Sequence, residues 1–251
     1  MLKTNYNSIA NSYNKRYTAN YLVNIEEEIK SLIEQNNYKT VLEAGCGTGR
    51  WINSLTQKGQ SIFGLDYSFE MLRLAKVNNA GLDIVNANAV HIPFKESIFD
   101  MIFCVNAIHH FPDKRKFIQQ CKEVLTNQGM LAVFGVDPHI DKQWYVYEYF
   151  ENVYENDLKR FPSLESLNQI FNEEGFNEFE IKTVEISDNN WIGNEVFNDP
   201  FLQKNHCSQL ANLSNEEYGK GINKIKLQLS KNPETVFESH IVFYLTKAIN
   251  K

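Results

Sequence analysis

The residues best suited to chemistry lie in and just after a short glycine-rich segment. The run VLEAGCGTGRW, residues 41–51, is typical of a strand that ends near Glu43 and turns through Gly45, Gly47 and Gly49 into a helix. Glycines let the backbone come close to a ligand and adopt conformations that a Cβ atom forbids. Because the N–H groups at a helix start also face outward, the segment predicts a ligand-binding turn.

The next candidate is Asp66, which ends the strand-like run SIFGLD. Its carboxylate could accept hydrogen bonds from both ribose hydroxyl groups of a nucleoside, and its distance from the turn suits that role. The alternative is that Asp66 only caps the helix that starts near Ser68. Together, the turn and the acid predict an adenosine-containing cofactor. A dinucleotide fingerprint needs a third glycine where this chain has Arg50, which disfavours NAD.

A third segment, Val85 to Asp113, completes a set of motifs with a consistent order and spacing. The set is E-A-G-C-G-T-G, then G-L-D-Y-S-F-E-M-L, then A-x-x-I-P-F-K-E-S-I-F-D, and then N-A-I-H-H-F. With these motifs the sequence resembles the class I S-adenosylmethionine-dependent methyltransferases, particularly the ubiquinone- and menaquinone-biosynthesis type and its small-molecule relatives. The resemblance runs from Tyr6 to about Asp137. Its opening Y-N-S-I-A-N-S-Y looks like the family's N-terminal lid.

The resemblance implies how S-adenosylmethionine is held. The methionine part is expected against Gly45, Gly47 and the backbone around Glu43, and the ribose against Asp66. The other expected cofactor contacts are Tyr67, Asn88 and Ala89 around the adenine, Asn106 beside the methionine amine, and the lid residues Tyr13 and Arg16. For the lid residues a solvated amphipathic helix is the competing interpretation.

Asn88 departs from the family pattern, which usually has Asp at this position. An amide oxygen can still accept a hydrogen bond from the adenine amino group, but the contribution of a negative charge is lost. We therefore expect somewhat weaker cofactor binding and an intact site.

Methyl transfer from a sulfonium needs a nucleophile held in line with the methyl group, and it needs neither a metal nor a covalent intermediate. His109 and His110 follow the fourth expected strand and are the candidate catalytic residues, because a histidine can act as a base near neutral pH. The alternative is that the pair only shapes the loop. The remaining histidines show no metal-ligand spacing. An aromatic run in residues 143–154 forms either a substrate wall or ordinary core.

Alternating strand-like and helix-like segments must position these residues. The apolar runs TVLEA, SIFGLD, LDIVNA, DMIFCV and MLAVFGV are separated by helical patterns, which Ser68 and Asp113 can cap. This alternation predicts a Rossmann-like α/β fold, a mostly parallel sheet with helices on both faces. The resemblance implies seven strands with the last one antiparallel. Beyond Asp137 we expect a helix from about Ser163 to Gly175, a strand NEFEIKTVEI, an irregular stretch, a helix with a Ser214–Glu217 capping box, and a final strand.

These elements fit one methyltransferase domain over residues 1–251, with an N-terminal lid at about 1–36. Insertions at about 138–165 and 188–213 are expected to cover the substrate. The net charge of −6 argues against a nucleic-acid groove, no run is long enough to span a membrane, and the start of the chain lacks the apolar centre of a signal peptide. The four cysteines are scattered, which predicts reduced thiols in a cytoplasmic protein.

The sequence thus predicts transfer of a methyl group from S-adenosylmethionine to O, N or C of a small-molecule metabolite. Three alternatives stay open: an NAD-dependent oxidoreductase, a cofactor-binding protein without catalysis, and, against the acidic charge balance, an RNA methyltransferase. The acceptor and the oligomeric state cannot be read from the sequence.

Overall fold

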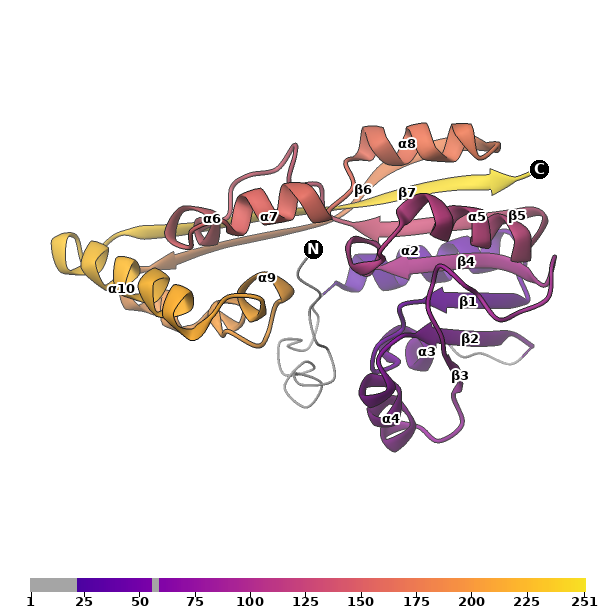
Figure 1. The fold of residues 1–251 in the computed structure, drawn as a ribbon, viewed down its shortest axis with the longest axis horizontal. Helices are drawn as coiled ribbons and strands as arrows, with labels where there is room; N and C mark the ends of the chain where they lie inside the picture. The colour runs from indigo at the N-terminus through magenta and orange to yellow at the C-terminus, as the bar shows by residue number, and fades with distance from the viewer. Residues whose placement is uncertain (1–21, 56–58) are drawn as a thin grey trace.

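The computed structural model describes residues 22–55 and 59–251. Its centre is a seven-stranded sheet in the order β3-β2-β1-β4-β5-β7-β6 (Figure 1). All pairs among the first five strands in this order are parallel, whereas β7 runs antiparallel to both β5 and β6. The predicted Rossmann-like sheet with an antiparallel last strand is confirmed. The strands are β1 (Thr40–Ala44), β2 (Ser61–Asp66), β3 (Asp83–Asn86), β4 (Phe99–Val105), β5 (Leu125–Gly135), β6 (Phe176–Ile192) and β7 (Val236–Asn250).

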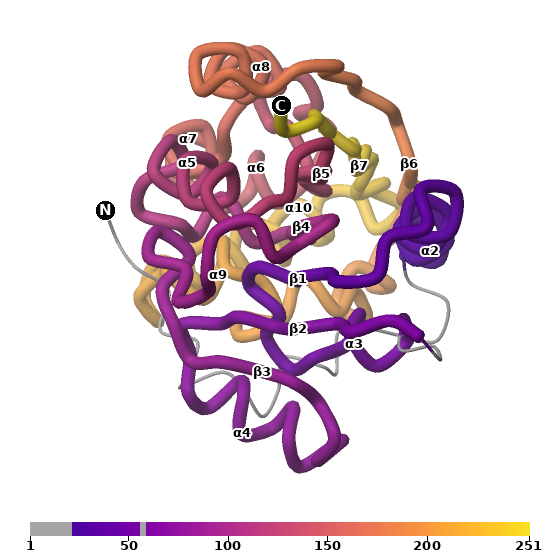
Figure 2. The backbone as a smooth tube through the Cα atoms, turned by 90° about the vertical axis from the view of Figure 1, so that its right-hand side faces the viewer, coloured from indigo at the N-terminus to yellow at the C-terminus, as the bar shows by residue number. Residues whose placement is uncertain are grey.

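Helices cover both faces of this sheet, and Figure 2 shows α2 and α5 on opposite sides of it. One face packs against α2, α3 and α4, and the other against α5 and α8. These helices are α2 (Val23–Gln35), α3 (Arg50–Leu55), α4 (Phe69–Asn78), α5 (Lys114–Val124) and α8 (Leu164–Glu173). The predicted caps are present: Ser68 accepts from the N–H of Met71, and Asp113 accepts from that of Lys116.

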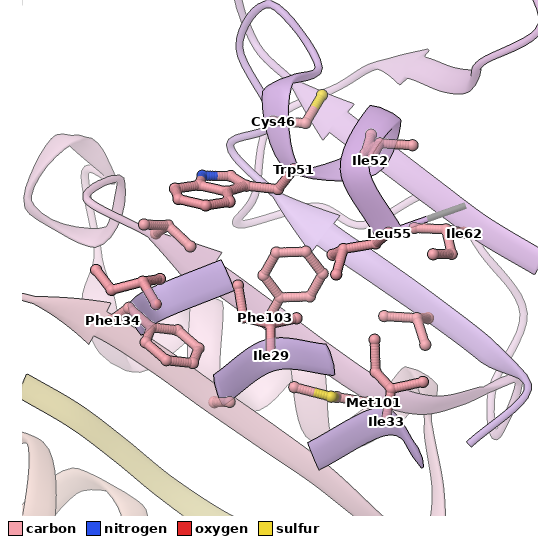
Figure 3. Packing of buried hydrophobic residues seen from close by; sticks show 14 of the residues in the cluster. Ile29, Ile33, Cys46, Trp51, Ile52, Leu55, Ile62, Met101, Phe103 and Phe134 are labelled. Carbon is pink, nitrogen blue, oxygen red and sulfur yellow. The ribbon is translucent and has the colours of Figure 1, made fainter. Parts of the chain in front are cut away.

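Figure 3 shows the first of these apolar layers. Ile29 and Ile33 of α2 and Trp51 of α3 point toward Phe103 of β4 and Phe134 of β5. Successive side chains of a strand point to opposite faces of the sheet, so the sheet has one apolar layer on each face. Phe103 belongs to this layer, whereas its neighbours Ile102 and Cys104 belong to the layer on the opposite face. Burial on both faces explains why the inner strands are continuous apolar runs.

The last two strands extend well beyond the rest of the sheet and carry a second group of helices (Figure 1). β6 has 17 residues and β7 has 15, and they pair along most of their length. We call the outer halves of these strands, with the elements packed on them, the outer module. Its other elements are α6 (Tyr145–Tyr149), α7 (Val153–Arg160), the short 3-10 helices Gly193–Asn198 and Pro200–Leu202, α9 (Ser208–Ala211) and α10 (Asn215–Lys231).

The outer module has an apolar cluster of its own, which includes Phe150, Val196, Leu210, Ile225 and Phe237. Helix α10 begins with the predicted capping box, in which Ser214 and Glu217 each accept from the other's backbone N–H. The irregular stretch expected after residue 186 begins later than predicted, because Ser187 to Ile192 continue β6 by pairing with β7.

Candidate active site

The predicted site residues gather at one edge of the sheet, where the parallel strands end. Glu43 lies near the end of β1, Asp66 ends β2, Asn88 follows β3 and Asn106 follows β4. Asp137, which the sequence reasoning did not single out, follows β5 in the same way. Ligands of open α/β sheets bind beyond these carboxyl ends. The same rule, applied to the fifth strand, would have identified Asp137.

The glycine turn is tied to the neighbouring strand and leaves space above it. The N–H groups of Gly45 and Cys46 both donate to the carbonyl of Leu65, at 2.7 and 3.0 Å. Gly45 has φ +80°, and a Cβ atom there would stand 2.5 Å from that of Ala107. Gly47 has φ +52°, and a Cβ atom there would meet nothing within 4 Å. The turn is therefore packed from below at Gly45 and open at Gly47, as a cofactor cradle requires.

Asp66 connects the glycine turn after β1 to the start of helix α4. One carboxylate oxygen accepts from the N–H of Gly47 at 2.8 Å, and the other accepts from the N–H of Ser68 at 2.7 Å. Burial raises the pKa of Asp66, and these backbone hydrogen bonds lower it. The contact with Ser68 is the local one that the capping alternative expects. The contact with Gly47 is not local, because it spans 19 residues of sequence.

Glu43 lies beneath the turn and is 1% exposed. Burial first, and then the nearby Asp66, raise the pKa of Glu43 well above its usual value, while a hydrogen bond from the backbone of Ile52 lowers it. Its Oε2 atom has no hydrogen-bond partner. An unpaired buried acceptor beside an open glycine turn suits a cofactor that carries an amino group.

The residues expected around the adenine lie on the far side of Asp66. Tyr67 is 63% exposed, so its ring offers a surface to a base. Asn88 is half-buried, and its side-chain oxygen accepts from the N–H of Val90 at 3.2 Å, while Ala89 between them is buried. The expected lid residues Tyr13 and Arg16 lie outside the described residues. The lid therefore stays a prediction.

A pocket opens beside Asn106, His109 and His110, on the other side of the glycine turn. His109 is buried and stacks on Phe161 at 3.9 Å between ring centroids, and His110 lies 3.8 Å from His109 by the same measure. The other residues that line the pocket come from the segment after β5, from the outer module and from β7. They are Val136, Asp137, Pro138, Asp141, Trp144, Tyr147, Phe161, Phe201, Cys207, Ser208, Gln209, His240, Ile241, Val242 and Phe243.

The aromatic run of residues 143–154 divides between core and pocket. Tyr145 and Phe150 belong to the cluster of the outer module, and the hydroxyl of Tyr145 donates to the buried Asp199 at 2.7 Å. Trp144 and Tyr147 line the pocket, with their rings in edge contact at 5.2 Å. Trp144 belongs to the same buried cluster, and Tyr147 packs against it, so these two residues are part of the core and of the pocket wall at once.

Fold and site together define a Rossmann-like domain for a nucleoside cofactor with an adjoining aromatic pocket. Residues 42–133 match the family described as methyltransferase domain. An uncharacterized protein of Methanocaldococcus jannaschii is 32% identical over 63% of this chain and 59% of its own length. The malonyl-[acyl-carrier protein] O-methyltransferase of Hamiltonella defensa is 30% identical over 52% of this chain and 50% of its own.

The fold also matches solved structures. Phosphoethanolamine N-methyltransferase 2 of Haemonchus contortus, in complex with S-adenosyl-L-methionine, aligns with a TM-score of 0.60 and 18% identity over 97% of this chain and 57% of that one. The chain is thus similar to the methyltransferase-domain family over residues 42–133, and its fold is the Rossmann-like fold of these solved structures. It spans 59%, 49% and 52% of the length of three curated relatives that it matches. Within residues 22–55 and 59–251, no helix is long and apolar enough to cross a membrane.

Proposed function

We propose that this protein transfers a methyl group from S-adenosylmethionine to O, N or C of a small-molecule metabolite. The observation that carries the proposal is the hydrogen bond from the N–H of Gly47 to the carboxylate of Asp66. This bond joins the proposed ribose acid and the glycine turn into one cofactor cradle, which lies beside the aromatic pocket. The family match over residues 42–133 supports it. A small acceptor fits the pocket, whose lining residues within the described chain include no lysine or arginine for a nucleic-acid backbone.

In this proposal each cofactor residue has a defined task. Gly47 and Gly45 let the backbone approach the methionine part, Asp66 accepts from the ribose hydroxyls, and Asn106 contacts the methionine amine. Tyr67, Asn88 and Ala89 surround the adenine. When bound, S-adenosylmethionine supplies a methyl group on a positively charged sulfur, which is already a good leaving group.

The remaining task of the protein is to orient the acceptor and to exclude water. The walls of the pocket come from the loop after β4, the segment after β5, the outer module and β7. Oriented proximity of this kind contributes roughly 7 to 11 kcal/mol to a reaction barrier. We therefore assign most of the rate to positioning, with His109 and His110 as supports or as a modest base.

The domain assignment and location are parts of the same proposal. Residues 1–251 form one methyltransferase domain, in which the segments 138–165 and 188–213 cover the substrate; both supply pocket residues, such as Tyr147 and Phe201. The four cysteines are buried thiols that form no disulfide, which supports a reducing, cytoplasmic environment.

The test is incubation of the protein with methyl-labelled S-adenosylmethionine and an extract that contains both metabolites and RNA, followed by identification of the labelled product. Label recovered in a small molecule supports the proposal. Label recovered only in RNA, or none recovered although S-adenosylmethionine binds, contradicts it. The second outcome would indicate a binding protein without catalysis.

A further inference from the structure

The permanently charged groups that line the pocket beside Asn106 have one sign, and three histidines, His109, His110 and His240, line it as well. Its described lining residues include two carboxylates, Asp137 and Asp141, and no lysine or arginine. An anionic acceptor would therefore have no fixed positive partner there, and it would meet two like charges. The charge balance favours a cation.

The two carboxylates differ in how far the protein already satisfies them. Asp137 is 1% exposed and accepts from the backbone N–H groups of His139 and Leu164 at 2.9 and 2.8 Å, and it also contacts the imidazole of His139 at 2.9 Å. Asp141 is half-buried and accepts one side-chain hydrogen bond, from the hydroxyl of Tyr244 at 2.8 Å. That bond and burial raise the pKa of Tyr244 to about 12, so the hydroxyl stays a donor. Asp141 therefore keeps acceptor capacity for a ligand.

The buried arginine nearest to this lining does not change the charge balance. Arg160 forms an ion pair with the buried Asp157 at 2.7 Å, and it also donates to Ser208. Asp157 in turn accepts from the hydroxyl of Tyr147 at 3.0 Å. The arginine charge is thus compensated by Asp157, and the pair holds Tyr147 and Ser208 in the pocket wall.

The remaining walls are aromatic. The pocket is lined by Trp144, Tyr147, Phe161, Phe201 and Phe243. Aromatic faces attract ammonium groups, most strongly where water is excluded, and carboxylates add to this attraction. A neutral apolar acceptor would pack against the rings, but it would leave the Asp141 carboxylate facing an apolar group. Leaving a charged group without a polar partner in this way is unfavourable.

We propose that the methyl acceptor is a small amine that is cationic at neutral pH, with its nitrogen paired to Asp141 among these aromatic side chains. This inference rests on the proposed function and names its substrate class. Before transfer the ammonium proton passes to the Asp141 carboxylate and on to solvent. The nitrogen lone pair then forms the new N–C bond, and the electron pair of the broken C–S bond stays on sulfur. The product nitrogen is again cationic.

Binding of three probes of nearly equal size tests the charge preference directly. Benzylamine, benzyl alcohol and benzoate are titrated at about pH 8, where histidine charge contributes least, with tryptophan fluorescence as the readout because Trp144 lines the pocket. Loss of the signal in Trp144→Phe assigns it to the pocket. We expect benzylamine to bind about tenfold more tightly than benzyl alcohol, or about 1.4 kcal/mol, and benzoate to bind least.

Two charge-removing variants make the test specific to Asp141. Asp141→Asn keeps an acceptor for Tyr244 and should reduce the preference for benzylamine to less than about threefold. Glu148→Gln removes an exposed carboxylate outside the pocket lining and should leave the preference unchanged. The inference is overturned if benzylamine does not bind, if either other probe binds as tightly, or if Asp141→Asn keeps the tenfold ratio.

S-adenosylhomocysteine, titrated into the same samples, separates this inference from the proposed function. If it binds and the amine preference is absent, the substrate class is wrong and the methyltransferase proposal stands. If it does not bind and the amine preference is present, the proposed function is wrong and the amine site stands.

Discussion

The carboxylate of Asp66 and the backbone N–H of Gly47 are joined by a 2.8 Å hydrogen bond that links the end of β2 to the turn after β1. This bond fixes Asp66, the proposed ribose acid, relative to the glycine turn. It also leaves acceptor capacity on both carboxylate oxygens, because each can accept more than one hydrogen bond. Asp66 is therefore the residue through which cofactor affinity is most directly tested.

Asp66→Ala should largely abolish the rise in melting temperature that S-adenosylmethionine causes in the unchanged protein. Binding to the folded state alone contributes about 2.7 kcal/mol at a hundredfold excess over the dissociation constant. Thermal-shift assays with S-adenosylmethionine and NAD measure this effect, and Asp83→Asn, an exposed aspartate at the start of β3, serves as the control. Stabilisation by NAD alone would refute the cofactor assignment.

The two glycines of the turn should respond differently to alanine. Gly45→Ala combines a left-handed backbone with a 2.5 Å approach to the Ala107 side chain, so we expect a loss of about 2 to 5 kcal/mol of stability. Gly47→Ala meets open space, so it should cost only about 1 to 2 kcal/mol while weakening cofactor binding. Denaturant unfolding and calorimetry separate the two effects. Equal losses of stability would contradict this division.

Asn88→Asp should tighten cofactor binding by about 0.5 to 1.5 kcal/mol, because a charged acceptor replaces a neutral one. An aspartate can keep the hydrogen bond from the N–H of Val90, so the loop should be unchanged. Calorimetry with S-adenosylhomocysteine measures the difference. Equal or weaker binding would mean that the amide is matched to its surroundings.

Glu43 should make the protein less stable as the pH rises. Its folded-state pKa is raised by burial, so above the unfolded pKa only the folded state keeps the proton. Stability is then full below the unfolded pKa and is lost as the pH rises toward the folded value. Glu43→Gln should flatten the fall in melting temperature as the pH rises above the usual range of glutamate. Glu27→Gln, at an exposed position on α2, should leave the slope unchanged, and identical slopes in all three proteins would refute the argument.

His109→Ala and His110→Ala should each leave measurable methyl transfer. His109 stacks on Phe161, so its loss should also lower stability. General-base help is typically worth about a hundredfold to ten-thousandfold, and a base would show as a fall in wild-type rate between about pH 7 and 5 that the variant lacks. A loss beyond about ten-thousandfold with unchanged cofactor affinity would overturn the positioning hypothesis.

Local sequence signals predicted the starts of several helices well. Ser68, Asp113 and the Ser214–Glu217 pair cap their helices as expected, because a cap is decided by neighbours within four residues. The outer half of β6 was missed. Its run from Ser187 to Asn190 is typical of a turn, and it forms strand only because β7 pairs with it from more than 45 residues away.

The pocket was predicted only in outline for the same reason. Asp141 and Phe243 have no local pattern that marks them as pocket residues, and they meet only after the sheet is assembled. His240, one of the histidines without metal-ligand spacing, lines the pocket beside them. The aromatic run around Trp144 did indicate that aromatic side chains lie near the substrate or in the core. The spacing of these aromatic residues along the sequence could not show which of them line the pocket and which lie in the core.

The separate apolar cluster of the outer module has an evolutionary consequence. Its core residues, such as Val196 and Ile225, are different from those that support the glycine turn and Asp66. Mutations can therefore reshape the acceptor wall while the cofactor cradle remains under its own selection. Descendants of one ancestor could acquire new acceptors by changes confined to the outer module, because α8 and the inner half of β6 pack with the cofactor half and would stay unchanged.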